Sequence, residues 1–276
     1  MPSSVPMSAA AQDPLNFAVI GCGSLALGAH IPNEFVAEVV RGDPGRRIGI
    51  AGVDPMGPDP EEQLEHALGL GLAGVSLSPV CQGFHPTHSL AMRLYECCAD
   101  RGVPLFVLGG GPMTASTMLE VGRPSAWDEV ARSFPTLPIV IGQMGYPWID
   151  ETLVLCGKHE RVHTDLSGVV SRPWQLYNAL LTASSLGVMD RLLFGSGFPF
   201  ETPSKAIELL YSINGVSLGT QLPSVARTSI RAIIERDSLK ALGLDHEPVE
   251  QRAGAPEQRQ AIVARAERGV SNHLDA

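Results

Sequence analysis

Positive charge is scarce and dispersed in this sequence of 276 residues. It carries 20 Lys and Arg against 29 Asp and Glu, a formal net charge of −9, and its basic residues form no cluster. Nucleic acids and anionic membranes are bound by concentrated positive charge, so neither is an expected partner. No uncharged stretch approaches the roughly 20 residues needed to cross a bilayer, although 44% of the residues are hydrophobic. We therefore expect a soluble, globular protein.

Cysteine pairs of the kind that make a disulfide framework or a zinc site are also missing. No CxxC occurs among Cys22, Cys81, Cys97, Cys98 and Cys156, and their number is odd. This usage is typical of a reducing cytoplasm. The first 13 residues lack the basic start and apolar run of a secretory signal, so we expect them to be a loose tail.

Short apolar runs alternate with amphipathic segments, and no internal repeat is present. The predicted strands are 16–21, 48–53, 73–77, 104–108, 138–142, 161–166 and 191–195. The helices predicted between them include 61–69, 89–101, 126–134, 149–159 and 205–213. This alternation predicts a parallel α/β fold. Successive predicted strands begin about 29 residues apart on average, a spacing that fits a (β/α)8 TIM barrel.

An eighth strand is not recognisable, so the barrel is expected to be incomplete or distorted. The predicted organisation is a tail over 1–15, one barrel domain over 16–245 and a polar appendage over 246–276. One surface helix over 257–268 would suit the composition of that appendage.

A short glycine pattern after the first predicted strand resembles a dinucleotide-binding fingerprint. Gly21-x-Gly23-x-x-Ala26 has the required spacing, and Asp54 ends the next strand. Asp54 comes 33 residues after Gly21 instead of about 20, and a short glycine motif is weak by itself. We favour a tight turn of a barrel, with an NAD-dependent oxidoreductase as a remote alternative.

Six ordered segments carry a more specific pattern. They are RRIGIAGVDP (46–55), EEQLEHALGLGLAGVSLSPVCQGFHP (61–86), RGVPLFVLGGGP (101–112), PIVIGQMGYPW (138–148), RVHTDLSG (161–168) and DRLLFGSGFPF (190–200). Together they resemble the amidohydrolase-related (amidohydrolase 2) family, which includes the aminocarboxymuconate semialdehyde decarboxylase-like enzymes. The resemblance implies a (β/α)8 barrel with its site at the carboxyl ends of the strands. It also implies hydrolysis or decarboxylation, mostly with a divalent metal.

The positions that would carry this chemistry in the family are altered. Family members use an H-x-H on the first strand, and no H-x-H occurs in this sequence, whose first run resembles the family's second strand. The fifth-strand His position is Leu108, the sixth-strand His position is Gln143, and Gly197 replaces the eighth-strand Asp. Leucine and glycine side chains cannot ligate a cation, and an amide does not act as an acid or base near pH 7. We expect no metal site of the family type and no cofactor.

Other residues offer only weaker substitutes. His85 and His88 form a ligand-like pair without a nearby carboxylate, and we expect them to be solvated. His163 and Asp165 share one face of the seventh strand by alternation. Asp165 would then face the barrel mouth, either as a functional group or as a structural carboxylate. Cys22 and Ser24, followed by His30, superficially resemble a nucleophile and base.

A ligand pocket at the barrel mouth is the remaining expectation. Its predicted residues are His85, Gln143, Tyr146, Trp148, Asp165 and Ser196, with Ser167 and Phe198 nearby. Aromatic walls with a few polar groups suit a small organic ligand. The open alternative is that Tyr146 and Trp148 merely pack their loop.

Three functions follow from these observations. The first is a catalytically degenerate barrel that binds a small molecule or serves in an assembly, as a homo-oligomer or with an active paralogue, because a missing strand exposes sheet edges. The second is an active hydrolase or decarboxylase with a rewired or metal-free site. The third is the NAD-dependent oxidoreductase.

Overall fold

The computed structural model describes residues 17–109 and 118–244. The predicted tail over 1–15 and the appendage over 246–276 lie outside the described residues. Seven parallel strands confirm the seven predicted runs with small changes at their ends. They are β1 (Phe17–Ile20), β4 (Arg47–Gly52), β5 (Gly74–Leu77), β6 (Leu105–Val107), β7 (Ile139–Ile141), β8 (Val162–Asp165) and β9 (Leu192–Leu193).

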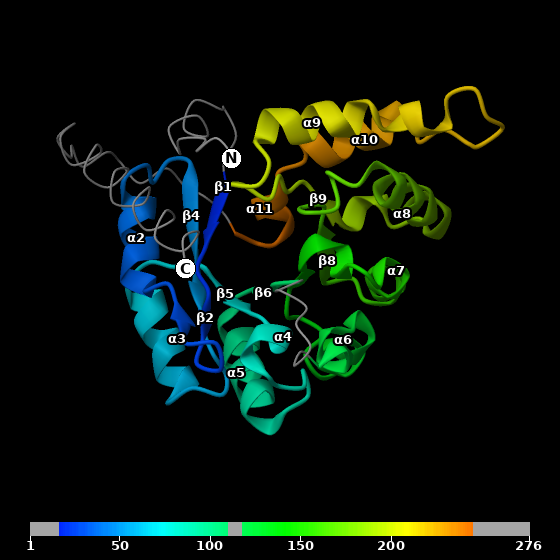
Figure 1. Cartoon of the computed structure of the whole chain (residues 1–276). Coiled ribbons are helices and arrows are strands. Elements are labelled where there is room, and N and C mark those ends of the chain that lie inside the picture. The colour runs from blue at the N-terminus through cyan, green and yellow to red at the C-terminus, as the bar shows by residue number, and fades with distance from the viewer. Residues whose placement is uncertain (1–16, 110–117, 245–276) are drawn as a thin grey trace.

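These strands form one curled sheet in the order β1-β4-β5-β6-β7-β8-β9. Figure 1 looks into the curl, with helices around its outside. Every described pairing in this sheet is parallel, and β1 and β9 stand at the two ends of the order. The architecture is a half-barrel, consistent with the predicted incomplete (β/α)8 barrel. Within the described residues, no strand closes the gap between β1 and β9.

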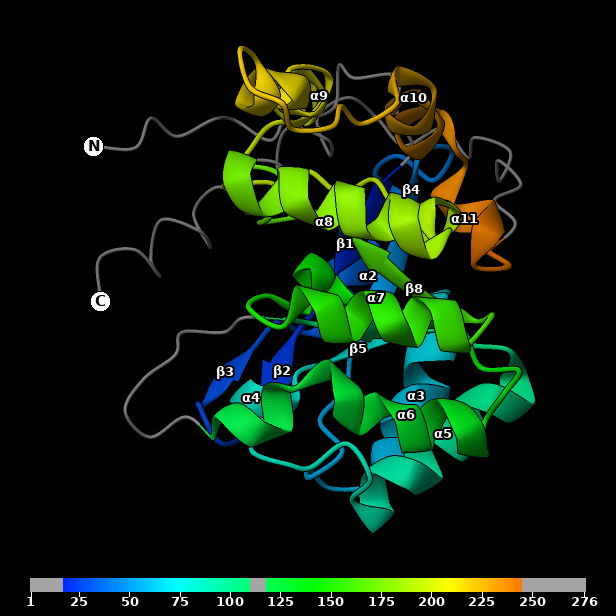
Figure 2. The same cartoon turned by 90° about the vertical axis from the view of Figure 1, so that its right-hand side faces the viewer.

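Helices connect the strands as the alternating pattern predicts. The five expected helices are α3 (Pro60–Gly69), α5 (Ser89–Arg101), α6 (Trp127–Ser133), α7 (Ile149–Lys158) and α9 (Pro203–Tyr211). Further helices, which were not singled out from the sequence, are α2 (Asn33–Arg41), α4 (Pro79–Gln82), α8 (Pro173–Leu186), α10 (Arg227–Glu235) and α11 (Ser238–Ala241). Figure 2 shows α6, α7 and α8 lying side by side on the outside of the sheet.

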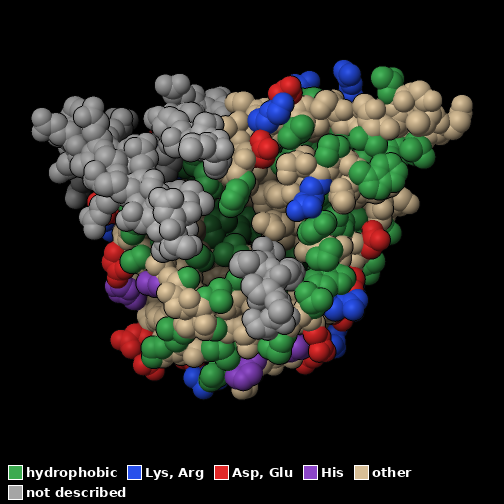
Figure 3. Space-filling model, viewed as in Figure 1, with side chains coloured by type: hydrophobic (Ala, Val, Ile, Leu, Met, Phe, Trp, Pro, Cys, Tyr) green, Lys and Arg blue, Asp and Glu red, His purple; other side chains and the backbone are tan. Residues whose placement is uncertain are grey.

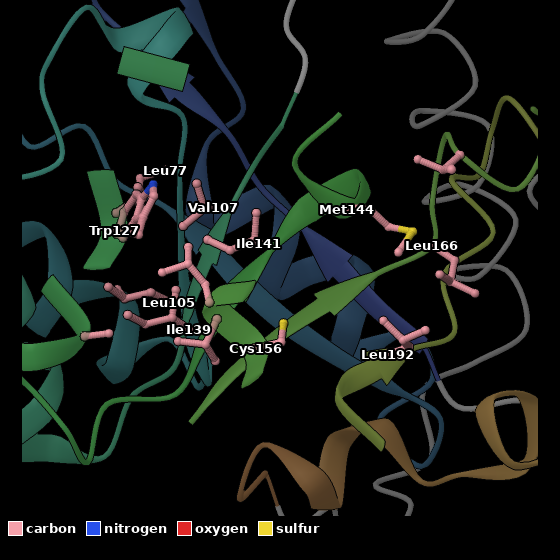
Figure 4. Close-up of a cluster of buried hydrophobic side chains, with 14 of the residues drawn as sticks. Leu77, Leu105, Val107, Trp127, Ile139, Ile141, Met144, Cys156, Leu166 and Leu192 are labelled. Atoms are coloured by element: carbon pink, nitrogen blue, oxygen red, sulfur yellow. The ribbon is translucent and has the colours of Figure 1, made fainter. Parts of the chain in front are cut away.

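Two apolar clusters lie on opposite faces of the sheet. The inner cluster contains Ile48, Ile50, Phe106, Val140, Leu193, Leu242 and Leu244. The space-filling view of this side shows a central hollow with hydrophobic side chains inside it (Figure 3). The outer cluster joins strand residues such as Leu105, Ile139 and Leu192 to the helices and contains Trp127 (Figure 4). Burial of apolar area on both faces is what makes continuous apolar strands favourable.

The short helix α11 contributes to the inner face. Leu242 and Leu244 follow this helix and belong to the inner cluster. They therefore bring apolar side chains to the region between β1 and β9, where Figure 1 shows α11.

The glycine pattern after β1 leads into a hairpin, not a helix. Strands β2 (Gly23–Ser24) and β3 (Ala29–His30) pair antiparallel, and α2 begins only at Asn33. A dinucleotide fingerprint needs a helix that starts at the glycine turn and directs its amino terminus toward the pyrophosphate. The prediction of a tight turn between strand and helix is therefore wrong, because a hairpin lies between β1 and α2. The NAD alternative lacks the helix amino terminus at the glycines that it requires.

Asp54, which ends the second predicted strand, has a structural role. Its carboxylate accepts hydrogen bonds from the backbone N–H groups of Leu25 and Met56, each at 2.9 Å. The hairpin is thus tied to the carboxyl end of β4. No helix in the described ranges has both the length and the apolar character needed to cross a membrane.

Candidate functional site

The carboxyl ends of β7 and β8 bring Gln143, Asp165 and Ser167 together. Register pairs Val140 with His163 and Asp165 with Leu193. Paired residues of neighbouring parallel strands share a face, and Val140 and Leu193 belong to the inner cluster. His163 and Asp165 therefore share the inner face, as predicted, with Asp165 at the mouth end.

Backbone groups surround the carboxylate of Asp165 closely. Its Oδ1 accepts the backbone N–H of Ser167 at 2.8 Å and also the Ser167 hydroxyl, and the backbone N–H of Gln143 donates to the same carboxylate. A Cβ on Gly195 would lie 3.1 Å from Oδ1, and one on Gly142 would lie 3.5 Å from Oδ2. Glycine at both positions therefore lets the backbone approach the carboxylate closely. Burial raises the pKa of Asp165, while the hydrogen bonds from Ser167 and Gln143 oppose that rise.

Gln143 adopts a strained backbone directly after β7. Gln143 and Met144 both have φ of 54°, in the left-handed region that residues with a Cβ rarely adopt. Strain of this kind costs on the order of 1–3 kcal/mol per residue and clusters at functional sites. The Gln143 side chain packs beside Gly168, where an added Cβ would lie 3.2 Å from Cδ. The amide is therefore held next to the loop that carries Ser167.

Gly197, which the resemblance places at the family's eighth-strand Asp position, lies in a turn. Gly197 has φ of 73°, and an added Cβ would lie 3.2 Å from the backbone nitrogen of Gly168. An Asp at this position would therefore be strained and crowded. The hydroxyl of Ser196 accepts the backbone N–H of Phe198 at 3.3 Å, which stabilises the turn. Leu108 continues β6, and its backbone N–H donates to the carbonyl of Leu77 at 2.8 Å.

Tyr146 and Trp148 belong to a neighbouring aromatic cavity. Its volume is about 20 Å³. That is room for roughly one water molecule. The aromatic residues that line it are Tyr146, Trp148 and Trp127, together with residues that include Leu108, Gly109 and Gly145. The structure thus separates the predicted pocket residues into a polar cluster of Gln143, Asp165 and Ser167 and a small aromatic cavity.

Two arginines stack on the aromatic residues. The guanidinium carbon of Arg172 lies 4.4 Å from the ring centre of Tyr146, and that of Arg123 lies 5.9 Å from Trp148. Arg123 is also paired with Glu151. These contacts fix the outer faces of both rings, which supports the interpretation that part of their role is packing.

His85 does not join the other predicted residues. It is exposed in the loop after α4, and its Nδ1 lies 2.9 Å from the Thr87 hydroxyl. His88 is also exposed, and its Nδ1 accepts the backbone N–H of Leu90 at 3.3 Å, which caps α5. The hairpin residue Ser24 donates to the carbonyl of Cys81 at 2.7 Å. This bond does not support the idea that Cys22 or Ser24 is a nucleophile with His30 as its base.

Gln82 has a structural role that was not predicted from the sequence. Its side chain is buried, accepts the backbone N–H of Ser78 at 2.8 Å and donates to the carbonyls of Gly23 at 2.6 Å and Val53 at 2.8 Å. This one amide joins α4, the hairpin and the end of β4. Gln82 begins the Gln-Gly-Phe stretch of segment 61–86, which contributes to the family resemblance, and this was the sequence feature that could have pointed to it.

The family of this chain follows from comparison with known proteins. A model of the amidohydrolase family matches residues 24–221. The chain belongs to the amidohydrolase family. No match was found among the curated proteins. The family assignment confirms the resemblance carried by the six segments.

Several solved structures share the fold of this family member. An uncharacterised TIM-barrel protein from Bordetella bronchiseptica is 19% identical, with a TM-score of 0.67, over 83% of this chain and 78% of its own. A 2,6-dihydroxybenzoate decarboxylase in complex with 2,6-dihydroxybenzoate is 17% identical, with a TM-score of 0.57, over 77% and 76%. The 5-carboxyvanillate decarboxylase from Sphingomonas paucimobilis is 13% identical, with a TM-score of 0.59, over 87% and 82%. At these identities the likeness shows the TIM-barrel fold.

The residues at this mouth do not fit the metal of the family. The resemblance described above implies that Leu108, Gln143 and Gly197 stand at the family's ligand and acid–base positions, and none of these side chains can ligate a cation as an imidazole or carboxylate does. Among residues 17–109 and 118–244, no three His, Cys, Asp or Glu side chains are grouped so that they could hold a metal ion. We derive no metal-dependent step for this chain.

Proposed function

We propose that this amidohydrolase-family barrel binds a small organic molecule at its mouth and has lost the metal-dependent chemistry of the family. The observation that carries the proposal is that residues 17–109 and 118–244 hold no group of three His, Cys, Asp or Glu side chains suited to a metal ion. The resemblance supports it, because it implies Leu108, Gln143 and Gly197 at the family's ligand and acid–base positions. Gln143, Asp165 and Ser167 would supply hydrogen-bonding groups, and the neighbouring Tyr146 and Trp148 would supply apolar surface. A solved relative in complex with 2,6-dihydroxybenzoate supports the choice of ligand class.

The test is binding of 2,6-dihydroxybenzoate, measured by calorimetry on metal-analysed protein. We expect saturable binding that weakens at least tenfold in Gln143→Leu, with no release of CO2. Asp190→Asn is the matched control, because Asp190 is exposed before β9, at the end of the strand opposite the mouth. Absence of binding to the unmodified protein would contradict this proposal.

A second candidate is an active hydrolase or decarboxylase with a rewired site. Asp165 favours it, because a carboxyl whose pKa is raised by burial can donate a proton at a higher pH than an exposed one. CO2 release that Asp165→Asn abolishes and Asp190→Asn leaves unchanged would establish this activity. Stoichiometric zinc or manganese in the same preparation would overturn the proposed loss of metal chemistry.

We further propose that the protein works as an oligomer, with itself or with an active paralogue. The ends of the sheet, β1 and β9, support this, since unpaired strand edges invite pairing. Ile20 on β1 is 40% exposed. Light scattering of the purified chain should give a mass above one protomer. A monomer that also fails to associate with a co-expressed paralogue would contradict this proposal. A reducing cytoplasm is the proposed location, supported by the five unpaired cysteines.

A further inference from the structure

An apolar cavity lies outside the barrel, between the start of α8 and the end of α9. Its volume is about 300 Å³. The residues that line it are Val170, Pro173, Leu209, Ser212, Ile213, Gly215 and Val216. Figure 2 shows α9 above the amino-terminal end of α8, where these residues meet. The short helix η5 (Ile213–Ser217) completes the wall.

The lining has no charged side chain. The hydroxyl of Ser212 donates to the carbonyl of Leu209 at 3.0 Å, so this polar side chain of the wall already has a partner. Pro173, Ser212 and Gly215 are exposed and form the rim, while Val170 and Ile213 are buried. A ligand that carried a charge would lose its hydration here without gaining an ionic partner. The chemistry of the wall therefore selects a neutral, apolar molecule.

The volume sets the size of that molecule. Apolar cavities of roughly 150 Å³ are large enough to hold benzene, and ligand pockets begin near 300 Å³. We propose that this cavity is a binding site for a small neutral apolar molecule, with one or two rings or an equivalent aliphatic body. It is separate from the mouth, and its function does not depend on the function proposed above.

One loop separates the cavity from the mouth. Between β8 and α8, Ser167 bonds to Asp165 on the mouth side, whereas Val170 lines the cavity. The backbone N–H of Val170 donates to the carbonyl of Leu166 at 3.0 Å, which keeps the loop compact. A molecule in the cavity would contact the back of the loop that positions Ser167.

The experiment uses toluene as the probe and benzoate as its charged counterpart, followed by methyl NMR of the full chain. We expect toluene to shift the methyl signals of Val170, Leu209 and Val216 saturably, and benzoate to leave them unchanged. Val216→Trp fills the cavity and should weaken toluene binding at least tenfold. Val154→Trp is the matched control, because Val154 is 58% exposed on α7.

Each outcome supports or overturns the proposal. If Val216→Trp does not fold, Leu209→Phe provides the second filled variant, and the methyl shifts of the unmodified protein locate the probe independently. Toluene that causes no saturable shift at these methyls, or benzoate that shifts them equally, would overturn the proposal. Coverage of the cavity by a second copy or by another part of the chain would also abolish the shifts, and it would overturn the proposal in the same way.

Discussion

The side-chain nitrogen of Gln82 lies 2.6 Å from the carbonyl oxygen of Gly23 and 2.8 Å from that of Val53. This pair of contacts holds the hairpin against the carboxyl end of β4. Because Gln82 is only 4% exposed, water cannot replace its hydrogen bonds at little cost.

We expect Gln82→Leu to destabilise the fold by about 3 kcal/mol, because it leaves two carbonyls and one N–H group without their partner. Urea unfolding measures the change. Gln63→Leu is the matched control, since Gln63 is only partly buried and its amide donates to the carbonyl of Pro58 at 2.6 Å. Equal stability of the two variants would show that the hairpin does not depend on Gln82.

The Asp128 carboxylate should contribute to the free energy of unfolding at neutral pH, and this contribution should be lost in acid. It accepts hydrogen bonds from Lys158 at 2.6 Å and His159 at 2.7 Å, which lower its pKa to about 2. The folded pKa lies below the unfolded value of about 3.9, so the contribution is present above pH 4 and disappears as the pH falls toward 2. Asp128→Asn should cost about 1–2 kcal/mol at pH 6 and almost nothing at pH 2.

The measurement is urea unfolding of the Asp128→Asn variant and its parent across this pH range. Asp190→Asn provides the control, because the Asp190 side chain is 62% exposed and lies 3.6 Å from Arg191. A cost that stays constant from pH 6 to pH 2 would refute the assignment to a titrating carboxylate.

Asp165 should show the opposite dependence on pH. Burial raises its pKa, so the folded state binds this proton more tightly than the unfolded state does. Stability is therefore lost as the pH rises from about 3.9 through the folded pKa. At pH 7 we expect the free energy of unfolding of Asp165→Asn to be no more than about 0.5 kcal/mol below that of the parent, and it can exceed that of the parent. Such a result is expected for a site at which stability is sacrificed for function. Urea unfolding at pH 7 measures the difference, and a loss of more than about 2 kcal/mol would show that the carboxylate is mainly structural.

The aromatic cavity should not tolerate a methyl group at Gly145. This residue has φ of 63°, and an added Cβ would overlap the Thr152 hydroxyl. We expect Gly145→Ala to cost about 3 kcal/mol, from left-handed strain and crowding together. Gly187→Ala isolates the strain, because Gly187 has φ of 71° and nothing within 4 Å of an added Cβ, so it should cost about 1 kcal/mol. Thermal unfolding of both variants distinguishes the two contributions.

Most of the fold was predictable because it depends on local pattern. Apolar runs such as 104–108 and 138–142 are long enough for buried strands, and the segment from Ser89 to Arg101 ends at a glycine. The α8 segment was missed because its apolar residues do not form one clear stripe against a polar face, and the hairpin was missed because its strands are two residues each.

The site was less predictable, because its geometry depends on neighbouring strands. The sequence by itself determined the family, through its six ordered segments, and the side-chain types at Leu108, Gln143 and Gly197. These types limit the chemistry that the three residues can perform. Only the tertiary structure decided that Asp165 meets Gln143 and Ser167, that Tyr146 lines a separate cavity and that His85 stays in solvent. The reason is physical: side-chain type is a local property, whereas pKa, strain and contact arise when parallel strand ends from distant parts of the chain are packed at one edge of a sheet.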